Sequence, residues 1–180
     1  MNHDDHVRLL RPGVRQQGGT WADFGSGGGA FTLALVELLG PNGTTIYSVD
    51  RDPHALRRQE EAMRSRFPAT RVHYVLADFT QPLDLPLLDG AVMANALHFQ
   101  RDQLAVLRLI AGYLRPGGTF LLVEYNTERG NHWRRRPASP TSPGSGASPA
   151  ALRVRSTRPP PRFRGRPGPN AEPRRAATQP

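Results

Sequence analysis

The stretch Trp-Ala-Asp-Phe-Gly-Ser-Gly-Gly-Gly-Ala-Phe, residues 21–31, constrains the fold of this chain more than any other segment. Its glycines follow a short apolar run and precede Phe31, Leu35 and Leu38, which recur at helical spacing. Glycine permits positive φ and lets a ligand approach the backbone, and a helix N-terminus offers free N–H groups to an anion. The segment therefore predicts a strand, a loop and a helix, with a ligand bound at the loop.

Beyond this unit, strand and helix signals alternate along the chain as far as residue 125. Such alternation is typical of an α/β domain, in which helices cover a mostly parallel sheet. Apolar and β-branched runs predict five strands, at residues 20–24, 44–50, 71–78, 88–95 and 119–125.

Four or five helices are expected around these strands. A short helix over residues 3–11 would lead the domain, and the glycine-rich loop would open a second over residues 28–39. Asp52 followed by Pro53 predicts the start of a third, because Asp is a strong N-cap and Pro fits the first helical position. Asp102 would cap a fourth. This helix would carry Leu104, Leu107, Ala111 and Leu114.

The charge is divided unevenly along the chain. Residues 1–133 hold 13 Arg and 14 acidic residues, whereas residues 134–180 hold 11 Arg and one acidic residue, Glu172. The net charge of +9 therefore comes from the tail and is not a nucleic-acid footprint on the domain.

Several classes of protein are excluded by composition. The absence of Cys excludes disulfides, cysteine–zinc clusters and thiol catalysis. The N-terminus does not have the pattern of a signal peptide, and its His-Asp-Asp-His run is not expected to hold a metal. No apolar run approaches the roughly 20 residues of a membrane span. We therefore expect a cytoplasmic protein without a membrane partner or a metal site.

The spacing of the glycines leaves the ligand open. Gly25-x-Gly27-x-x-Ala30 satisfies the dinucleotide pattern G-x-G-x-x-G/A, which alone is a weak indication. Asp50, at the end of the second predicted strand, is well placed to bind two ribose hydroxyls. NAD and other adenosyl ligands fit these two features equally well.

Three further features distinguish these ligands. Asp23 extends the loop motif to Asp-x-Gly-x-Gly-x-Gly over residues 23–29. Ala77-Asp78-Phe79 ends the third strand with an acid and an aromatic ring that suit an adenine. The run Leu-Arg-Pro-Gly-Gly-Thr-Phe-Leu-Leu-Val-Glu-Tyr joins the end of a helix to a strand through a Pro-Gly-Gly turn. With this motif set, residues 18–126 resemble the class I S-adenosylmethionine-dependent methyltransferases.

The resemblance implies a Rossmann-like three-layer sandwich with S-adenosyl-L-methionine as cofactor. The glycine loop would accommodate the methionine end of the cofactor, and Asp23 would meet its amino group directly or through water. Asp50 would accept hydrogen bonds from the ribose hydroxyls, with Arg51 beside the adenine. These positions agree with the rule that ligands of open parallel sheets bind beyond the carboxyl ends of the strands.

The other end of the cofactor is implied to meet the third and fourth strands. Asp78 and Phe79 would contact the adenine, and Asn95 would lie beneath the sulfonium and methyl. The alternative is that Asp50 and Asp78 are turn residues and Asn95 a strand-end cap. The full implied cofactor-binding set is Asp23, Gly25, Ser26, Gly27, Gly29, Asp50, Arg51, Asp78, Phe79 and Asn95.

Methyl transfer from a sulfonium is an in-line displacement with a good leaving group. Positioning alone can supply roughly 7–11 kcal/mol, and a general base is needed only where the acceptor must lose a proton first. His98 and Glu124, near the carboxyl ends of the fourth and fifth strands, are the candidate catalytic residues, with Tyr125 alongside. Each also fits a packed or solvent-facing role. The acceptor is expected to be a small molecule that the sequence does not identify.

The resemblance also implies a C-terminal antiparallel hairpin beside the fifth strand, and no run after Trp133 reads as either of its strands. The edge of residues 119–125 is therefore expected to be free and open to self-association, which natural proteins avoid. Residues 134–180 hold 11 Pro and 11 Arg but only three residues from Leu, Ile, Val, Met and Phe, so they are expected to be disordered.

Two origins fit this tail. It could be an Arg/Pro-rich arm that contacts nucleic acid non-specifically, although Phe163 is its one aromatic residue. We favour a shifted reading frame, because the chain has 24 Arg and no Lys, as a GC-rich gene would give, and the tail is mostly Arg, Pro, Ala, Gly and Ser.

The sequence thus predicts an N-terminal helical segment, 1–17, an incomplete methyltransferase domain, 18–133, and a disordered tail, 134–180. The predicted function is methyl transfer from S-adenosylmethionine, weakened or abolished by loss of the C-terminal hairpin. The alternatives are an NAD(P)-dependent oxidoreductase on the same sheet and a non-enzymatic nucleic-acid binder that acts through the basic tail.

Overall fold

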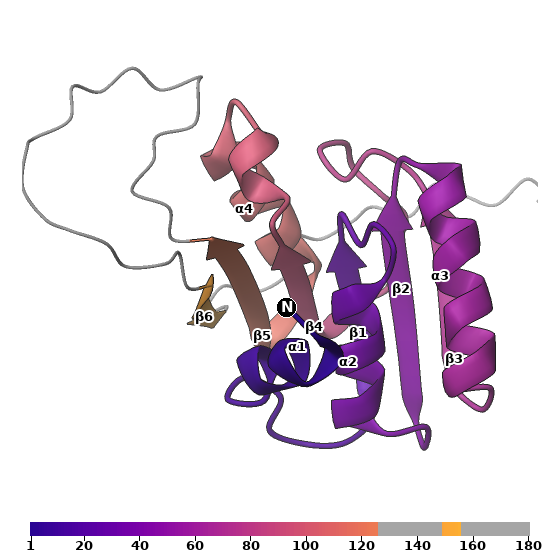
Figure 1. Cartoon of the computed structure of the whole chain (residues 1–180). Helices are drawn as coiled ribbons and strands as arrows, with labels where there is room; N and C mark the ends of the chain where they lie inside the picture. The colour runs from indigo at the N-terminus through magenta and orange to yellow at the C-terminus, as the bar shows by residue number, and fades with distance from the viewer. Residues whose placement is uncertain (126–148, 156–180) are drawn as a thin grey trace, which may run out of the picture.

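The structure, a computed structural model, describes residues 1–125 and 149–155 of the chain (Figure 1). The helices and strands follow one another in the order α1 (His3–Leu10), β1 (Gly19–Phe24), α2 (Ala30–Leu39), β2 (Thr44–Asp50), α3 (Pro53–Arg66), β3 (Arg71–Leu76), β4 (Leu88–Ala94), the 3-10 helix η1 (Leu97–Phe99), α4 (Gln103–Tyr113), β5 (Leu114–Tyr125) and β6 (Pro149–Arg155).

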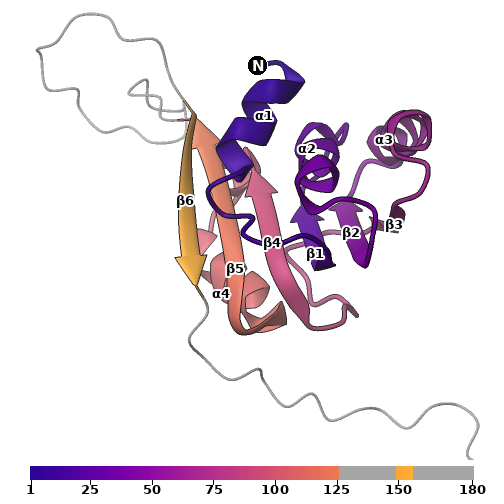
Figure 2. The same cartoon turned by 90° about the horizontal axis from the view of Figure 1, so that it is seen from below.

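These strands form one sheet of six, in the order β3-β2-β1-β4-β5-β6. Strands β1 to β5 are parallel to their neighbours, and β6 is antiparallel to β5. Helices α1, α2 and α3 lie over one face of the sheet and α4 lies over the other (Figure 2). The predicted Rossmann-like three-layer sandwich with a mostly parallel sheet is confirmed.

The strand order fixes where a ligand can bind. From β1 the chain moves outward through β2 to β3, then returns to the other side of β1 to add β4 and β5. Loops that leave β1 and β4 therefore diverge to opposite faces and open a crevice between them. In open parallel sheets, ligands bind at this switch point, beyond the carboxyl ends of the strands.

The outer edge of β5 is not free, contrary to the sequence prediction. Residues Pro149–Arg155 run antiparallel along β5, from the pair Thr119 and Arg155 to the pair Tyr125 and Pro149. The prediction was wrong because it averaged apolar content over 47 residues, whereas two of the three large apolar residues of the tail, Leu152 and Val154, fall within these seven. Self-association through an open β5 edge loses its basis, and the rest of the predicted disordered tail lies outside the described residues.

Two clusters of buried side chains hold the layers together, one on each face of the sheet. The cluster on the α1–α3 face gathers residues of α1 and α2 around Trp21 and Ile46. The cluster on the α4 face gathers Val106, Ile110 and Tyr113 around residues of β1, β4 and β5. Of the apolar residues expected on α4, Leu104 is 54% exposed, whereas Leu107 packs against the cluster on the α4 face and Leu114, which begins β5, is buried.

The predicted helix starts are confirmed. The Asp52 side chain accepts a hydrogen bond from the His54 N–H, with Pro53 at the first helical position. The Asp102 side chain accepts from the Ala105 N–H at 2.9 Å and opens α4. No helix in the part of the chain that the structure describes is both long and apolar enough to cross a membrane.

Gly90→Ala is expected to destabilise the fold. Gly90 pairs with Trp21 across β4 and β1, and a Cβ at Gly90 would lie 2.3 Å from the Trp21 ring. Overpacking of this kind costs about 1–3 kcal/mol, which chemical denaturation would show as a lower midpoint. Gly28→Ala is the matched control, because a Cβ there meets open space. Equal midpoints for the two variants would contradict this packing.

Candidate active site

A cavity of about 230 Å³ lies at the carboxyl ends of β1, β2, β3 and β4. Its volume is a little below the roughly 300–1,000 Å³ typical of small-molecule sites. Six predicted cofactor residues line it: Gly25, Asp50, Arg51, Asp78, Phe79 and Asn95. The structure therefore brings together residues that come from the ends of four strands.

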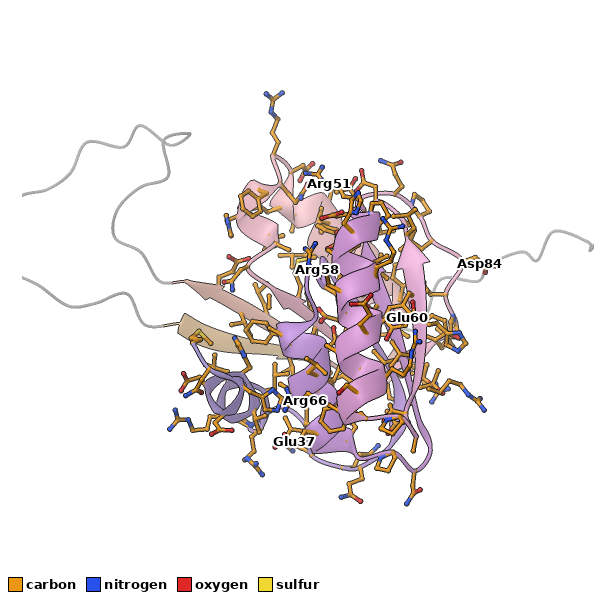
Figure 3. All side chains as sticks on the ribbon, turned by 45° about the vertical axis from the view of Figure 1, so that its right-hand side comes forward. Glu37, Arg51, Arg58, Glu60, Arg66 and Asp84 are labelled. Carbon is orange, nitrogen blue, oxygen red and sulfur yellow. The ribbon has the colours of Figure 1, made fainter. Side chains whose placement is uncertain are left out.

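Four lining residues were missed by the sequence analysis: Thr80, Ala96, Phe99 and Gln100. They directly follow predicted site residues at the ends of β3 and β4, so loop position was the signal that could have found them. Figure 3 shows Arg51 at the N-terminal end of α3, whereas Arg66 lies at the opposite end of that helix, away from the cavity.

The glycine loop is shaped by what packs against it. At Gly25 φ is +74°, and a Cβ would lie 2.7 Å from the Cβ of Ala96 and 3.1 Å from the Phe79 ring. At Gly29 φ is +84°, and a Cβ would lie 2.3 Å from Cγ of Gln59. A Cβ at Gly27 or Gly28 would meet no protein atom within 4 Å. The tip of the loop, Gly27 and Gly28, thus has space for a ligand, while Gly25 and Gly29 at its two ends pack closely against other residues.

Ser26 supports the loop from below rather than lining the cavity. Its hydroxyl lies 2.7 Å from the Ser48 hydroxyl, which also lies 2.9 Å from Oε1 of Gln59. Ser48 and Gln59 are fully buried and Ser26 nearly so. This polar network ties the loop to β2 and α3 and so fixes its position.

Asp50 combines a structural and a binding position. Its Oδ2 accepts a hydrogen bond from the Gly27 N–H at 2.7 Å, and its Oδ1 accepts one from the Asp52 N–H at 2.8 Å. An ionised carboxylate has about four lone-pair sites, so two remain for further donors. Because Asp50 also lines the cavity, its carboxylate can accept from two hydroxyls of a ligand while it holds the loop.

Asp23 lies below the same loop and is 1% exposed. The Thr32 hydroxyl donates to its Oδ2 at 2.6 Å. Burial raises the pKa of Asp23 to about 7, the Thr32 hydrogen bond opposes that rise, and the Asp50 carboxylate adds to it. Asp23 does not line the cavity, so its contact with a cofactor amino group stays a prediction.

Asn95 has the properties of a residue held for a ligand. Its φ is +53°, the one positive φ of a non-glycine residue in the described chain. Its N–H donates to the Val123 carbonyl at 2.8 Å, which holds it at the end of β4. Its Oδ1 is buried and has no hydrogen-bond partner within residues 1–125 and 149–155, although Asn95 lines the cavity. Strain and an unpaired buried acceptor at one residue indicate a functional site.

Asp78 and Phe79 form the part of the cavity wall that follows β3. The Asp78 Oδ1 accepts from the Thr80 N–H at 2.9 Å, and this hydrogen bond holds the pKa of Asp78 below its ordinary value. Phe79 lies between this turn and Gly25, where its ring forms part of the cavity wall. A charged acceptor and a ring face therefore adjoin here.

The two candidate catalytic residues lie in contact with each other. His98 Nδ1 lies 2.7 Å from Oε2 of Glu124, and the Leu97 N–H donates to Oε1 of Glu124 at 2.9 Å. Neither side chain lines the cavity, but Phe99, the neighbour of His98, does. Sequence reasoning placed both residues at this edge of the sheet and did not foresee their contact. No cluster of metal-ligating side chains occurs in the part of the chain that the structure describes.

Comparisons with known proteins agree with this geometry. Residues 16–140 match a family described as a methyltransferase domain. Relatives include the carboxy-S-adenosyl-L-methionine synthase of Chromohalobacter salexigens, 32% identical over 105 residues, which are 57% of this chain and 38% of that protein. Another is the ubiquinone/menaquinone biosynthesis C-methyltransferase UbiE of Pasteurella multocida, 31% identical over 116 residues, 63% of this chain and 42% of that protein.

Solved structures show the same fold. Coclaurine N-methyltransferase bound to N-methylheliamine and S-adenosylhomocysteine superposes with a TM-score of 0.61 at 21% identity, over 68% of this chain and 36% of that one. TrmN from Thermus thermophilus gives a TM-score of 0.58 at 25% identity, over 66% of this chain and 37% of that one.

The family match covers well over half of the chain. The chain therefore belongs to the methyltransferase-domain family, the class I S-adenosylmethionine-dependent methyltransferases, whose cofactor is S-adenosylmethionine. This decides between the two ligands that the glycine spacing left open. The chain spans 38% and 42% of the length of the two curated relatives above.

Asp23→Asn is expected to flatten the pH dependence of stability. The folded-state pKa of Asp23 is raised from 3.8 to about 7, so between these values the folded chain keeps a proton that the unfolded chain releases. Stability of the unchanged protein therefore falls as pH rises through this window, by a few kcal/mol in total at about 1.4 kcal/mol per pKa unit. Asn keeps an acceptor for Thr32 and cannot ionise.

Urea unfolding at a series of pH values measures this slope. Asp84→Asn, on the exposed surface seen in Figure 3, is the control and should keep the slope of the unchanged protein. A slope that survives in Asp23→Asn would show that another group causes it.

Asn95→Gly is expected to stabilise the ligand-free protein and weaken cofactor binding. Glycine adopts a φ of +53° without strain, and the change removes a buried Oδ1 that lacks a partner within the described residues. Thermal unfolding should shift upward, while the affinity for S-adenosylhomocysteine by calorimetry should fall at least about fivefold, roughly 1 kcal/mol. Asn42→Gly, in an exposed loop, is the control for affinity. Unchanged affinity in Asn95→Gly would remove Asn95 from the site.

Proposed function

We propose that this chain binds S-adenosylmethionine in the cavity and transfers the methyl group to a small-molecule acceptor. One observation supports this above all: six residues implied by the family resemblance, from the ends of four strands, line a single cavity. Turn or cap roles for Asp50, Asp78 and Asn95 do not by themselves explain why all three line the same cavity. We keep the cytoplasm as the predicted location.

The lining residues and the neighbouring glycine loop fit the chemistry of the cofactor part by part. The open tip at Gly27 and Gly28 has room for the methionine end, and Asp50 has acceptor sites left for the ribose hydroxyls. Asp78 and Phe79 offer an acceptor and a ring face to the adenine. The unpaired Oδ1 of Asn95 offers a negative partial charge where the cationic sulfonium would lie.

When bound, the cofactor supplies an electrophilic methyl group on a sulfonium that leaves as a neutral thioether. The protein residues hold that methyl in line with an acceptor that enters past Phe99, at the mouth of the cavity. Alignment of this kind contributes roughly 7–11 kcal/mol to lowering the barrier. The buried network of Ser26, Ser48 and Gln59 keeps the loop from shifting, so the alignment is set before the cofactor arrives.

The relatives do not settle the acceptor. One is named a C-methyltransferase of quinone biosynthesis, another a ribosomal protein L11 methyltransferase, and a structural neighbour an N-methyltransferase. Each match covers less than half of the relative, so the acceptor must be inferred from the residues of this chain.

Asp50→Ala is expected to weaken binding of S-adenosylhomocysteine at least about tenfold, a loss of roughly 1.4 kcal/mol, because the ribose loses its acceptor and the Gly27 N–H its partner. Isothermal titration calorimetry of the full chain measures this. Asp84→Ala is the control and should bind normally. Asp50→Asn keeps an acceptor oxygen and should show an intermediate affinity. NAD, titrated into the same protein, should not bind.

Two outcomes would overturn the proposal. Equal affinity for S-adenosylhomocysteine in Asp50→Ala and the unchanged protein would place the cofactor elsewhere. Binding of NAD that is tighter than binding of S-adenosylhomocysteine would restore the oxidoreductase alternative.

A further inference from the structure

The pair of His98 and Glu124 lies beside the cavity, and neither side chain lines it. His98 belongs to η1, which follows β4, and Glu124 lies at the end of β5. Both side chains are partly exposed, 32% for His98 and 25% for Glu124. They therefore lie at the carboxyl edge of the sheet, on the β5 side of the cavity, where solvent and small molecules can reach them.

The contact fixes which nitrogen of His98 can act as a base. Nδ1 lies 2.7 Å from the Glu124 carboxylate, which can only accept, so the neutral imidazole carries its proton on Nδ1 and its lone pair on Nε2. No described residue makes a hydrogen bond to Nε2. An imidazole oriented by a carboxylate, with its other nitrogen free, is the arrangement that general bases use.

The Glu124 carboxylate is itself held in place. Its second oxygen accepts from the Leu97 N–H at 2.9 Å, so both of its oxygens are used and the side chain cannot rotate freely. The backbone hydrogen bond alone would tie η1 to β5. The imidazole contact is not needed for that tie, and a structural role therefore leaves it unexplained.

Phe99 supplies the third part of the arrangement. It is 77% exposed, it lines the cavity, and its ring centroid lies 4.0 Å from that of His98. An exposed aromatic ring in the wall of a cavity offers a face on which a ligand ring can pack. A ring stacked on Phe99 would have its substituents beside the imidazole.

We propose that the methyl acceptor is a phenol whose ring packs on Phe99 and whose hydroxyl gives its proton to Nε2 of His98, with Glu124 as a positioning residue. The inference rests on the proposed function and names its acceptor class. A hydroxyl needs such a base, whereas a thiol ionises near neutral pH without one.

The step balances. The O–H bond breaks and its proton passes to Nε2, which leaves an imidazolium beside the Glu124 carboxylate. The oxygen electron pair forms the new C–O bond to the methyl carbon, and the electrons of the C–S bond remain on sulfur, giving S-adenosylhomocysteine. The imidazolium then releases its proton to solvent, so one proton leaves for each methyl transferred.

A binding experiment without turnover tests the base. 4-Nitrophenol absorbs visible light only as its anion, so it is titrated into the full chain saturated with S-adenosylhomocysteine, at a mildly acidic pH where the free phenol is neutral. The anion band is expected to appear with the unchanged protein and with His73→Gln, a control at an exposed histidine of β3. It should be absent with His98→Gln. Phe99→Ala should weaken binding of the phenol at least fivefold.

Rates of methyl transfer to a phenol and to a thiol distinguish a general base from a residue with a structural role. Methylation of unsubstituted phenol, whose hydroxyl is neutral at mildly alkaline pH, should fall by about 10²–10⁴ in His98→Gln, while methylation of thiophenol at the same pH stays within about threefold. Glu124→Gln should show a smaller loss with the same selectivity for the phenol. A structural role would reduce both reactions equally.

The possible results have distinct meanings. Equal loss for phenol and thiophenol, an anion band that persists in His98→Gln, or a chain that binds S-adenosylhomocysteine and methylates no phenol would overturn the phenol inference alone. A chain that does not bind S-adenosylhomocysteine would overturn the proposed function beneath it.

Discussion

The Asp50 carboxylate at the end of β2 accepts backbone N–H groups from the glycine loop and from the residue that caps α3. It therefore joins the loop after β1 to the end of β2 and the start of α3. A chain of two buried serines and Gln59 supports the same loop from the other side. Because the loop is held from two sides, the space beside Gly27 and Gly28 can stay open, and that opening gives a cofactor access to the backbone.

The sequence predicted those features of the fold and the site that depend on residues close together in the chain. The five parallel strands and the caps of α3 and α4 follow from hydrophobic runs and from Asp and Pro at helix starts, whereas the six cavity residues follow from the family resemblance, which agrees with the rule that strand ends meet at one edge. Asn95 was implied by the resemblance. Its left-handed backbone was not foreseen, and its N–H donates to the Val123 carbonyl of β5, a contact that no local pattern contains.

What the sequence could not predict depends on partners distant along the chain. Ser26 was expected in the cavity because it lies in the motif, but Ser48 and Gln59 draw its hydroxyl underneath. The hydrophobic pattern of α4 did not identify its buried face, because apolar residues occur around most of the helix, and packing buries Val106, Ile110 and Tyr113. Strand β6 gains its place from backbone pairing with β5, which composition does not reveal.

Gln59 occupies the space that a side chain at Gly29 would need. The start of α2 and the middle of α3 therefore pack in direct contact at these two residues. Neither Gly29 nor Gln59 can be substituted freely by itself. A larger residue at position 29 would displace the Gln59 side chain, and a shorter residue at position 59 would leave a void beneath the loop. Redesign of this protein for another cofactor would have to treat these two sites, thirty positions apart in the chain, as a single unit.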